Sequence, residues 1–233
     1  HAIRLYQTMT HKMGLNPGVN FKDWMQKITH AHGISSMGDL QKLRMNLPEF
    51  VNTVNPSDLG GLDAKLAIIS SDITTHTKAE FPKMSKLYWA NPDEVKISEV
   101  VRASMSIPFF FEPYLVKNIP NAGKEADPGW DEFAKYLGPV PPSVRFVDGG
   151  MLSNFPINVF HRPDAGVPRM PTFGARLSVY REDFSKADTL LGTVGAMVST
   201  MRQIYDYDFL MRNPDYVNLI CRIDADKKYN WLE

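Results

Sequence analysis

The sequence lacks several features that would each point to a particular class of protein. It contains one cysteine, Cys221, which excludes an internal disulfide and is typical of a reducing compartment. We expect this cysteine to be a buried strand residue. No run of about eighteen apolar residues occurs, so no segment is long enough to cross a bilayer as a helix, although attachment to a membrane surface stays open.

An excess of charge of either sign is also absent. The 26 Lys and Arg residues equal the 26 Asp and Glu residues, which gives a formal net charge of zero. Without a global positive field, nucleic acid is not expected as a partner. The 43% of hydrophobic and 22% of charged residues are typical of a globular protein and not of a disordered chain.

Neither end of the sequence has the features of a natural protein terminus. It begins at His1 without an initiator methionine or a signal segment, and it stops at Glu233 just after an expected strand. We therefore expect a fragment of a longer protein. A cytoplasmic or peripheral-membrane location fits the sequence, and secretion through a lost leader stays open.

Hydrophobic periodicity predicts strands that are separated by helices. Helices are expected over 20–33, 40–47, 98–107 and 190–205, with one more starting at Pro156; strands are expected over 66–69, 144–147, 172–179 and 216–223. Asn20 and Asp23 are expected to form a capping box, and Ser98 to cap the third helix. The alternation predicts an α/β layered domain, treated as one domain over 1–233.

One carboxylate, Asp148, is expected at the end of a strand, where Gly149 and Gly150 allow a sharp turn and a close approach. Three interpretations compete. The simplest is a turn aspartate, because Asp-Gly is a common turn dipeptide. The second is a metal ligand acting with Asp63 and Asp72, and the third is the general base of a nucleophilic hydrolase.

A second informative segment, 104–113, runs from small residues at a helix end into three phenylalanines. Ser104 and Ser106 are expected to be helix caps or pocket-lining residues, because no nucleophile elbow surrounds them. Three consecutive aromatics cannot all face one side of a strand. We expect most of them to pack in the core and at least one to line a cavity or pack elsewhere.

These two segments, taken in order, resemble the patatin-like phospholipase family. The resemblance rests on Ser104 to Pro113, on Val147-Asp148-Gly149-Gly150 and on Asn154-Phe155-Pro156. Upstream, the segments 14–18, 33–40 and 69–74 resemble the middle region of that family. The resemblance therefore covers the chain from about Gly14 to its end.

The resemblance implies a hydrolase of lipid acyl esters with a serine–aspartate dyad, no catalytic histidine, no cofactor and no metal. Asp148 would be the catalytic base and Gly149 and Gly150 its motif turn. The fold implied is a central mixed, mostly parallel sheet flanked by helices, incomplete at both ends. A lipid or phospholipid would be the substrate, and the acyl pocket would be lined by Ser104, Met105, Ile107, Pro108, Phe109, Phe110 and Asn154.

The sequence departs from the family pattern in two respects, because it contains no Gly-x-Ser-x-Gly and no glycine-rich loop followed by a basic residue, which in that family forms the oxyanion hole. The segment 33–38 comes nearest, but its glycines have the wrong spacing and it joins two helices, so Ser35 and Ser36 are expected to be loop and cap residues. We expect the nucleophile outside this chain, which would then be inactive alone. The alternative is a catalytically inactive lipid-binding or interaction domain of the same fold.

Residues 114–143 form a Pro- and Gly-rich stretch that is long for an irregular insertion and is expected to be a lid or a variable loop. We expect the aromatic residues of 130–137, among them Trp130 and Phe133, to be exposed and to help meet a lipid surface. A loop without function is the alternative. The histidines His30, His32, His76 and His161 are expected to be structural or solvated.

Overall fold

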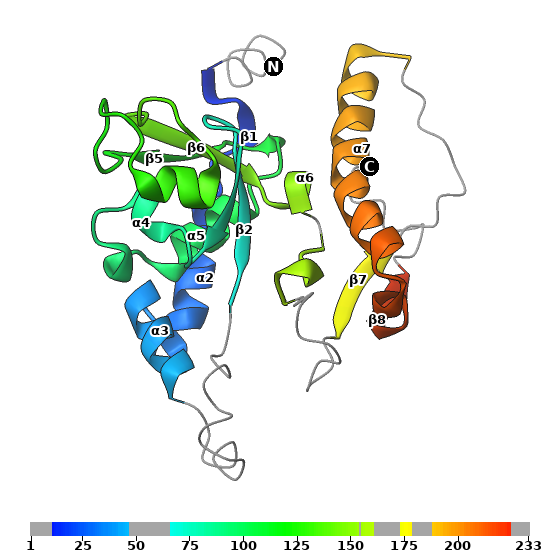
Figure 1. Cartoon of the computed structure of the whole chain (residues 1–233), viewed down its shortest axis with the longest axis horizontal. Helices are drawn as coiled ribbons and strands as arrows, with labels where there is room; N and C mark the ends of the chain where they lie inside the picture. Colours follow the sequence, from blue (N-terminus) through cyan, green and yellow to red (C-terminus); the bar gives the residue numbers. More distant parts are fainter. Residues whose placement is uncertain (1–10, 47–65, 154, 161–172, 179–187, 225–233) are drawn as a thin grey trace. The chain divides into compact units, whose positions relative to one another are not determined.

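The computed structural model describes residues 11–46, 66–153, 155–160, 173–178 and 188–224. The chain divides into two compact units, and the boundary between them in the sequence falls between Gly149 and Gly150. The first unit contains the larger sheet and most of the short helices, and the second contains one long helix (Figure 1). A single domain over 1–233 stays a prediction.

A four-stranded sheet in the order β3-β2-β6-β5 organises the first unit. Its strands are β2 (Ile68–Asp72), β3 (Thr77–Phe81), β5 (Tyr114–Lys117) and β6 (Ser143–Asp148). All neighbouring strands run antiparallel, with Ile68 opposite Phe81, Ser70 opposite Asp148 and Tyr114 opposite Phe146. The register places Asp148 at the end of a strand that has a neighbour on each side.

The α/β class is confirmed, but the expectation of a mostly parallel central sheet is wrong for this four-stranded sheet. Residues 73–76 join β2 to β3 directly, and so short a connection can join only antiparallel neighbours. Parallel pairing occurs in two smaller sheets of the described chain, so the strand pairing as a whole is mixed. These sheets pair β1 (Gly14–Asn16) with β4 (Phe109–Phe111), and β7 (Gly174–Ser178) with β8 (Ile220–Asp224).

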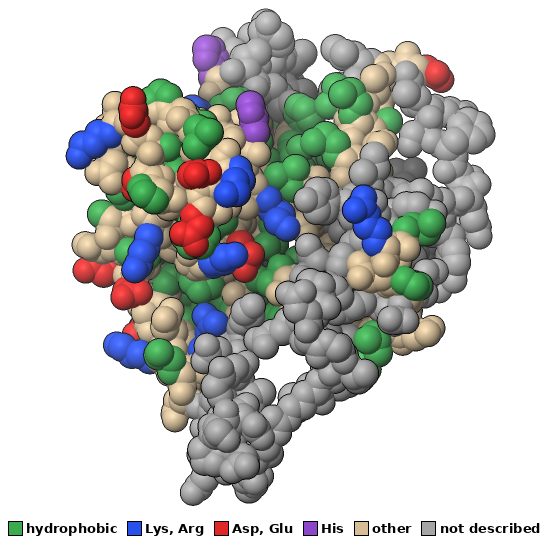
Figure 2. Space-filling model, in the orientation of Figure 1, with side chains coloured by type: hydrophobic (Ala, Val, Ile, Leu, Met, Phe, Trp, Pro, Cys, Tyr) green, Lys and Arg blue, Asp and Glu red, His purple; other side chains and the backbone are tan. Residues whose placement is uncertain are grey.

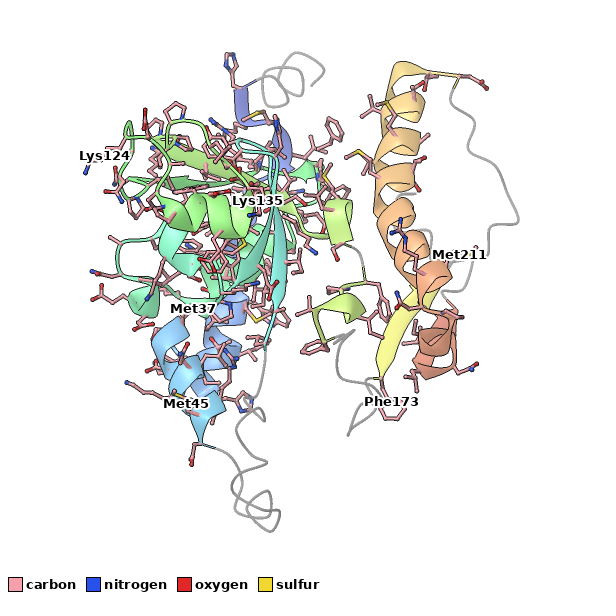
Figure 3. All side chains as sticks on the ribbon, viewed as in Figure 1. Met37, Met45, Lys124, Lys135, Phe173 and Met211 are labelled. Carbon is pink, nitrogen blue, oxygen red and sulfur yellow. The ribbon has the colours of Figure 1, made fainter. Side chains whose placement is uncertain are left out.

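Short helices complete the first unit. They are α2 (Val19–Ala31), α3 (Met37–Met45), α4 (Ser85–Tyr88), η3 (Pro92–Glu94), α5 (Ile97–Ser104) and the π-helical turn η4 (Trp130–Ala134). Helix α5 packs against α2, β2 and β6. Helix α3 is anchored at one end, because Met37 is 4% exposed and Met45 is 75% exposed (Figure 3).

The helix caps differ from those expected. Helix α2 begins after Gly18 without a side-chain cap, and Ser98 lies inside α5, where its hydroxyl donates to Gln26 Oε1 at 2.7 Å. Both expected caps are therefore wrong. The capping box lies at α3 instead, between Ser36 and Asp39, which confirms Ser36 as a cap. Backbone N–H donors at this helix start lower the pKa of Asp39.

Five rings form an aromatic core on one face of the four-stranded sheet. They are Phe81, Tyr88, Trp89, Trp130 and Phe146, and their contacting pairs have centroids 4.9 to 6.1 Å apart. Trp130 is 1% exposed because its ring packs edge-on against Tyr88. The expectation that Trp130 is an exposed lipid-facing residue is therefore wrong.

The described part of the second unit contains three short helices, one long helix and a parallel pair of strands, with one strand before the long helix and one after it. Its helices are α6 (Gly150–Ser153), η5 (Ile157–Phe160), α7 (Leu190–Arg212) and η6 (Pro214–Leu219). The long helix and the strand over 174–178 are confirmed. The last strand is shorter than expected, because residues 214–219 are helical. Cys221 lies in β8 as expected but is exposed, so its expected burial is wrong.

Basic and acidic side chains are interspersed on the face drawn in Figure 2, in keeping with the formal net charge of zero. No helix within the described residues combines the length and hydropathy that a membrane span requires.

Candidate functional site

Asp148 is the last residue of β6 and is half-buried. Because side chains alternate along a strand, Asp148 lies on the same face of β6 as Val144 and Phe146, which belong to the hydrophobic core. The strand thus carries apolar residues inside the unit and presents a carboxylate where the core ends. This is the arrangement that the sequence predicted for residues 144–148.

Three hydrogen bonds fix the backbone around Asp148. Its N–H donates to the carbonyl of Ser106 at 2.9 Å, and the N–H of Gly149 donates to the carbonyl of Ser104 at 3.0 Å. On the other side, the Ser71 hydroxyl donates to the carbonyl of Asp148 at 2.9 Å. The turn is therefore held between β2 and the end of α5, which restricts where the carboxylate can lie.

Gly149 has to be a glycine because of the chain that lies beside it. A Cβ at this position would overlap the carbonyl oxygen of Ile69 in β2. The same carbonyl accepts a hydrogen bond from the Ser104 hydroxyl at 2.6 Å. Any side chain at 149 would push β2 away from the Asp148 turn. Gly150, the other expected motif glycine, is the first residue of α6.

Arg102 supports this segment from inside α5 and was not anticipated from the sequence. It is 3% exposed, and its guanidinium donates to the Ser106 hydroxyl and to the carbonyls of Pro17 and Glu112 at 3.0 and 2.7 Å. It also lies over the ring of Phe111, 5.4 Å from the centroid. Burial lowers the pKa of Arg102, and the nearby Glu112 carboxylate raises it.

Arg102 therefore connects the start of α2, the end of β4 and the residue that accepts from Asp148. The Ser106 hydroxyl donates in turn to the Arg102 carbonyl at 2.8 Å, so this pair is held by two hydrogen bonds. A sequence signal existed, because Arg102 stands among Val100, Val101 and Ala103 in an apolar helix segment. A buried arginine in that setting needs several acceptors.

The structure brings part of the expected acyl-pocket segment to Asp148. Ser104 contacts the turn directly, and Met105, Ile107 and Pro108 are half-buried. Phe109 and Phe110 are 45% and 40% exposed. The expectation that most of these phenylalanines pack in the core is therefore wrong. Asn154 lies outside the described residues, and a role of the segment in binding an acyl chain stays a prediction.

The exposed phenylalanines belong to a larger surface that we call the apolar ribbon. It consists of the exposed apolar residues on and beside β1 and β4, namely Met13, Leu15, Val19, Phe109 and Phe110. Phe109 and Met13 have φ angles of 69° and 59°. This left-handed conformation costs an L-residue about 1 to 2 kcal/mol, so two large apolar side chains are held both strained and exposed.

Two cavities adjoin the helices of the first unit. One of about 380 Å³ lies between residues 16–21, at the start of α2, and Phe111 of β4. The other, of about 290 Å³, has a polar lining from α3, Asp93 and Glu94. The first cavity lies beside the apolar ribbon and shares Val19 with it.

Asp72, named in the metal alternative, has a structural role. Its carboxylate accepts hydrogen bonds from the N–H groups of Thr74 and Thr75 and from the hydroxyls of Thr75 and Tyr88. Burial raises the pKa of Asp72, and these hydrogen bonds oppose that rise. Asp63 lies outside the described residues. Of the three carboxylates that the metal interpretation requires, that of Asp72 is therefore already engaged by hydrogen bonds within a turn.

Comparison with known proteins gives two matches and one negative result. The family model of patatin-like phospholipases matches residues 7–161, which include the segment 104–113 and Asp148. The chain is 28% identical over 197 residues to the uncharacterized protein YqhO of Bacillus subtilis (strain 168); the alignment covers 84% of this chain and 52% of that protein. The chain thus spans about half the length of this curated relative.

No solved structure matches the chain. The family match alone covers more than half of the 233 residues and contains the whole Asp148 turn. The chain belongs to the patatin-like phospholipase family.

Proposed function

We propose that the protein containing these residues hydrolyses acyl esters of lipids, with Asp148 as the general base of a serine–aspartate dyad. Membership of the patatin-like phospholipase family supports lipid acyl hydrolysis in general. The single observation that supports Asp148 as the base is its turn. This carboxylate stands at the end of a core strand, on a backbone held by hydrogen bonds to Ser104, Ser106 and Ser71.

In the proposed reaction, Asp148 accepts the proton of a serine hydroxyl while the serine oxygen attacks the ester carbonyl. The tetrahedral intermediate collapses with cleavage of the carbon–oxygen ester bond, and Asp148 returns the proton to the departing alcohol. Water, deprotonated by the same carboxylate, then attacks the acyl-enzyme and releases the fatty acid and the serine. No histidine is needed, because one carboxylate accepts and donates the proton in both halves.

We propose that the nucleophile and the oxyanion donors lie outside these 233 residues. The chain has no Gly-x-Ser-x-Gly, and it spans 52% of the relative from Bacillus subtilis. We therefore expect negligible turnover from this chain alone, because loss of a catalytic serine lowers turnover by about a millionfold in a serine hydrolase.

A serine-directed fluorophosphonate probe tests the location of the nucleophile. We expect the probe to label the full-length protein and to leave the purified 233-residue chain unlabelled, with ester turnover following the same pattern. Labelling of the short chain would contradict the proposal. A full-length protein that the probe does not label would favour the alternative, a non-catalytic lipid-binding domain of the same fold, which the missing Gly-x-Ser-x-Gly also favours.

A further inference from the structure

Ser70 lies in the middle of β2 and carries a hydroxyl group that the fold does not engage. The residue is 0% exposed, and its Oγ has no hydrogen-bond partner among the residues that the structure describes. A buried hydroxyl in this state destabilises a fold, because its hydrogen bonds to water are lost and are not replaced. An alanine would occupy the same position without that cost. The serine therefore indicates a use other than stability.

The register of the sheet gives this hydroxyl two directly opposed neighbours. Ser70 pairs with Ala79 of β3 on one side and with Asp148 of β6 on the other, where β2 and β6 lie side by side (Figure 1). Directly opposed side chains of an antiparallel pair lie on the same face, with their Cβ atoms about 4.5 to 5.5 Å apart. Ala79 offers only a methyl group. The polar side chain opposite Ser70 is therefore that of Asp148.

A second carboxylate, that of Asp72, lies on the same face of β2, two residues after Ser70. Its oxygens already accept hydrogen bonds from the turn that follows β2 and from the Tyr88 hydroxyl. Residues two apart on one strand are also separated by about 6.5 Å, which is more than the separation of an opposed pair. Asp148 is therefore favoured over Asp72 as the acceptor for Ser70.

Two contacts hold β2 and β6 in this register. The Ser71 hydroxyl donates to the carbonyl of Asp148 at 2.9 Å, and Gly149 approaches the carbonyl of Ile69 so closely that a Cβ would overlap it. The two neighbouring serines of β2 thus differ in what they face. Ser71 holds the backbone of Asp148, and Ser70 lies opposite its side chain.

We propose that Ser70 is a positioning residue for Asp148: its hydroxyl donates to one carboxylate oxygen and leaves the other oxygen to accept the proton of the nucleophile. The proposal rests on the proposed role of Asp148 as the general base. Rotation about χ1 of either side chain lets an opposed pair form a hydrogen bond of about 2.7 Å. A carboxylate that is held by one oxygen samples fewer rotamers, which raises turnover because the base is already in place.

Steady-state kinetics of the full-length protein on p-nitrophenyl butyrate test the proposal, with Ser70→Ala as the key variant. We expect kcat to fall about tenfold with KM unchanged, because a hydrogen bond to a charged group is lost. The melting temperature should stay at or above the wild-type value, because the variant removes a hydroxyl that the fold does not engage. Ser70→Thr keeps the hydroxyl on a side chain suited to a strand and should recover most of kcat.

Ser85→Ala is the matched control. Ser85 is the first residue of α4, is 3% exposed, and its hydroxyl likewise lacks a partner within the described part of the chain. This variant removes the same group from a helix instead of from the strand beside β6. We therefore expect neither kcat nor the melting temperature to fall.

Wild-type kcat in Ser70→Ala would overturn the proposal, as would an equal loss of kcat in Ser85→Ala. A lower melting temperature in Ser70→Ala would also overturn it, because the hydroxyl would then stabilise the fold. In the Asp148→Asn background, Ser70→Ala should cause no further loss, and a second tenfold loss would show that Ser70 acts on another group.

Asp148→Asn alone separates this proposal from the proposed function. If Asp148→Asn is inactive while Ser70→Ala keeps the wild-type kcat, the positioning role fails and Asp148 stands as the base. If Asp148→Asn keeps wild-type turnover, the base assignment fails, and the positioning role fails with it.

Discussion

The aromatic core and the apolar ribbon contain the same residue types in opposite environments, since the core is buried and the ribbon is exposed. In the core, Phe81, Tyr88 and Phe146 are fully buried and pack edge-to-face with centroids 4.9 to 5.7 Å apart. In the ribbon, Phe109 and Phe110 are exposed, and Phe109 has a strained backbone. The first set stabilises the sheet that carries Asp148. The second set adds little to the stability of the first unit, because Phe109 and Phe110 are 45% and 40% exposed.

The difference shows that the hydrophobicity of a segment does not reveal whether it faces the core. The run Phe109–Phe111 is as apolar as any strand of the chain, yet it forms one of two short strands with open surroundings. Trp130 stands in a Pro- and Gly-rich stretch, yet it is buried in the core.

Truncation in the aromatic core should have the largest effect on stability. Phe146→Ala removes a ring that touches both Phe81 and Tyr88, and we expect the free energy of unfolding to fall by about 3 to 5 kcal/mol. Urea unfolding followed by circular dichroism measures this. A loss below about 1 kcal/mol would mean that these rings do not form the cohesive core described.

Arg102 connects the two regions, so its removal should loosen the ribbon. Arg102→Met leaves the Ser106 hydroxyl and the carbonyls of Pro17 and Glu112 without their donor, and we expect a loss of about 2 to 3 kcal/mol. Hydrogen exchange should show loss of protection in β1 and β4 while β2 and β3 stay protected. Arg102→Lys is the control, and it should recover only part of the loss because an ammonium group cannot reproduce the planar fork.

The pH dependence of stability should report on Asp72, which accepts from Tyr88 of the aromatic core. The pKa of Asp72 is raised in the folded state, so its contribution is fully present below the unfolded pKa and is lost as pH rises through the folded pKa. Relative to Asp72→Asn, we expect the wild-type free energy of unfolding to fall as pH rises above the pKa of an unfolded aspartate, about 3.9. A wild-type stability that rises over this range relative to the variant contradicts the direction.

The smallest change in stability is expected in the ribbon itself. Phe109→Asn exchanges partly buried apolar surface for relief of backbone strain, and we expect the free energy of unfolding to change by less than about 1 kcal/mol. The control is Phe110→Asn, which has similar exposure without a positive φ and should be the more destabilising variant. The reverse order in thermal melts would show that strain at 109 is not what distinguishes the two.

Local patterns predicted much of the fold because they depend on neighbouring residues. The helix ending before Gly33, the Ser36 cap, the strand leading to Asp148 and the long helix α7 follow from periodicity and turn chemistry. Strand order could not be predicted in this way. A short apolar run forms a strand equally well beside a parallel or an antiparallel neighbour, and the neighbour depends on long-range contacts.

The candidate site likewise combines features that the sequence predicted with features that it did not. The Asp148 turn was predictable from a strand followed by two glycines, and the proximity of Ser104 and Ser106 followed only from the family resemblance. Arg102 was missed because its acceptors on Pro17 and Glu112 come from separate segments. Burial of Trp130 depends on Tyr88, which is equally remote in sequence.

The central claim is that Asp148 is the catalytic base, and the most direct test is lipid ester turnover by the full-length protein carrying Asp148→Asn. The amide keeps the size of the side chain and leaves the backbone hydrogen bonds to Ser106 and Ser71 intact. We predict that turnover falls by about 10⁴-fold while the melting temperature stays at the wild-type value. Turnover within about tenfold of the wild type would contradict the assignment of Asp148 as the base.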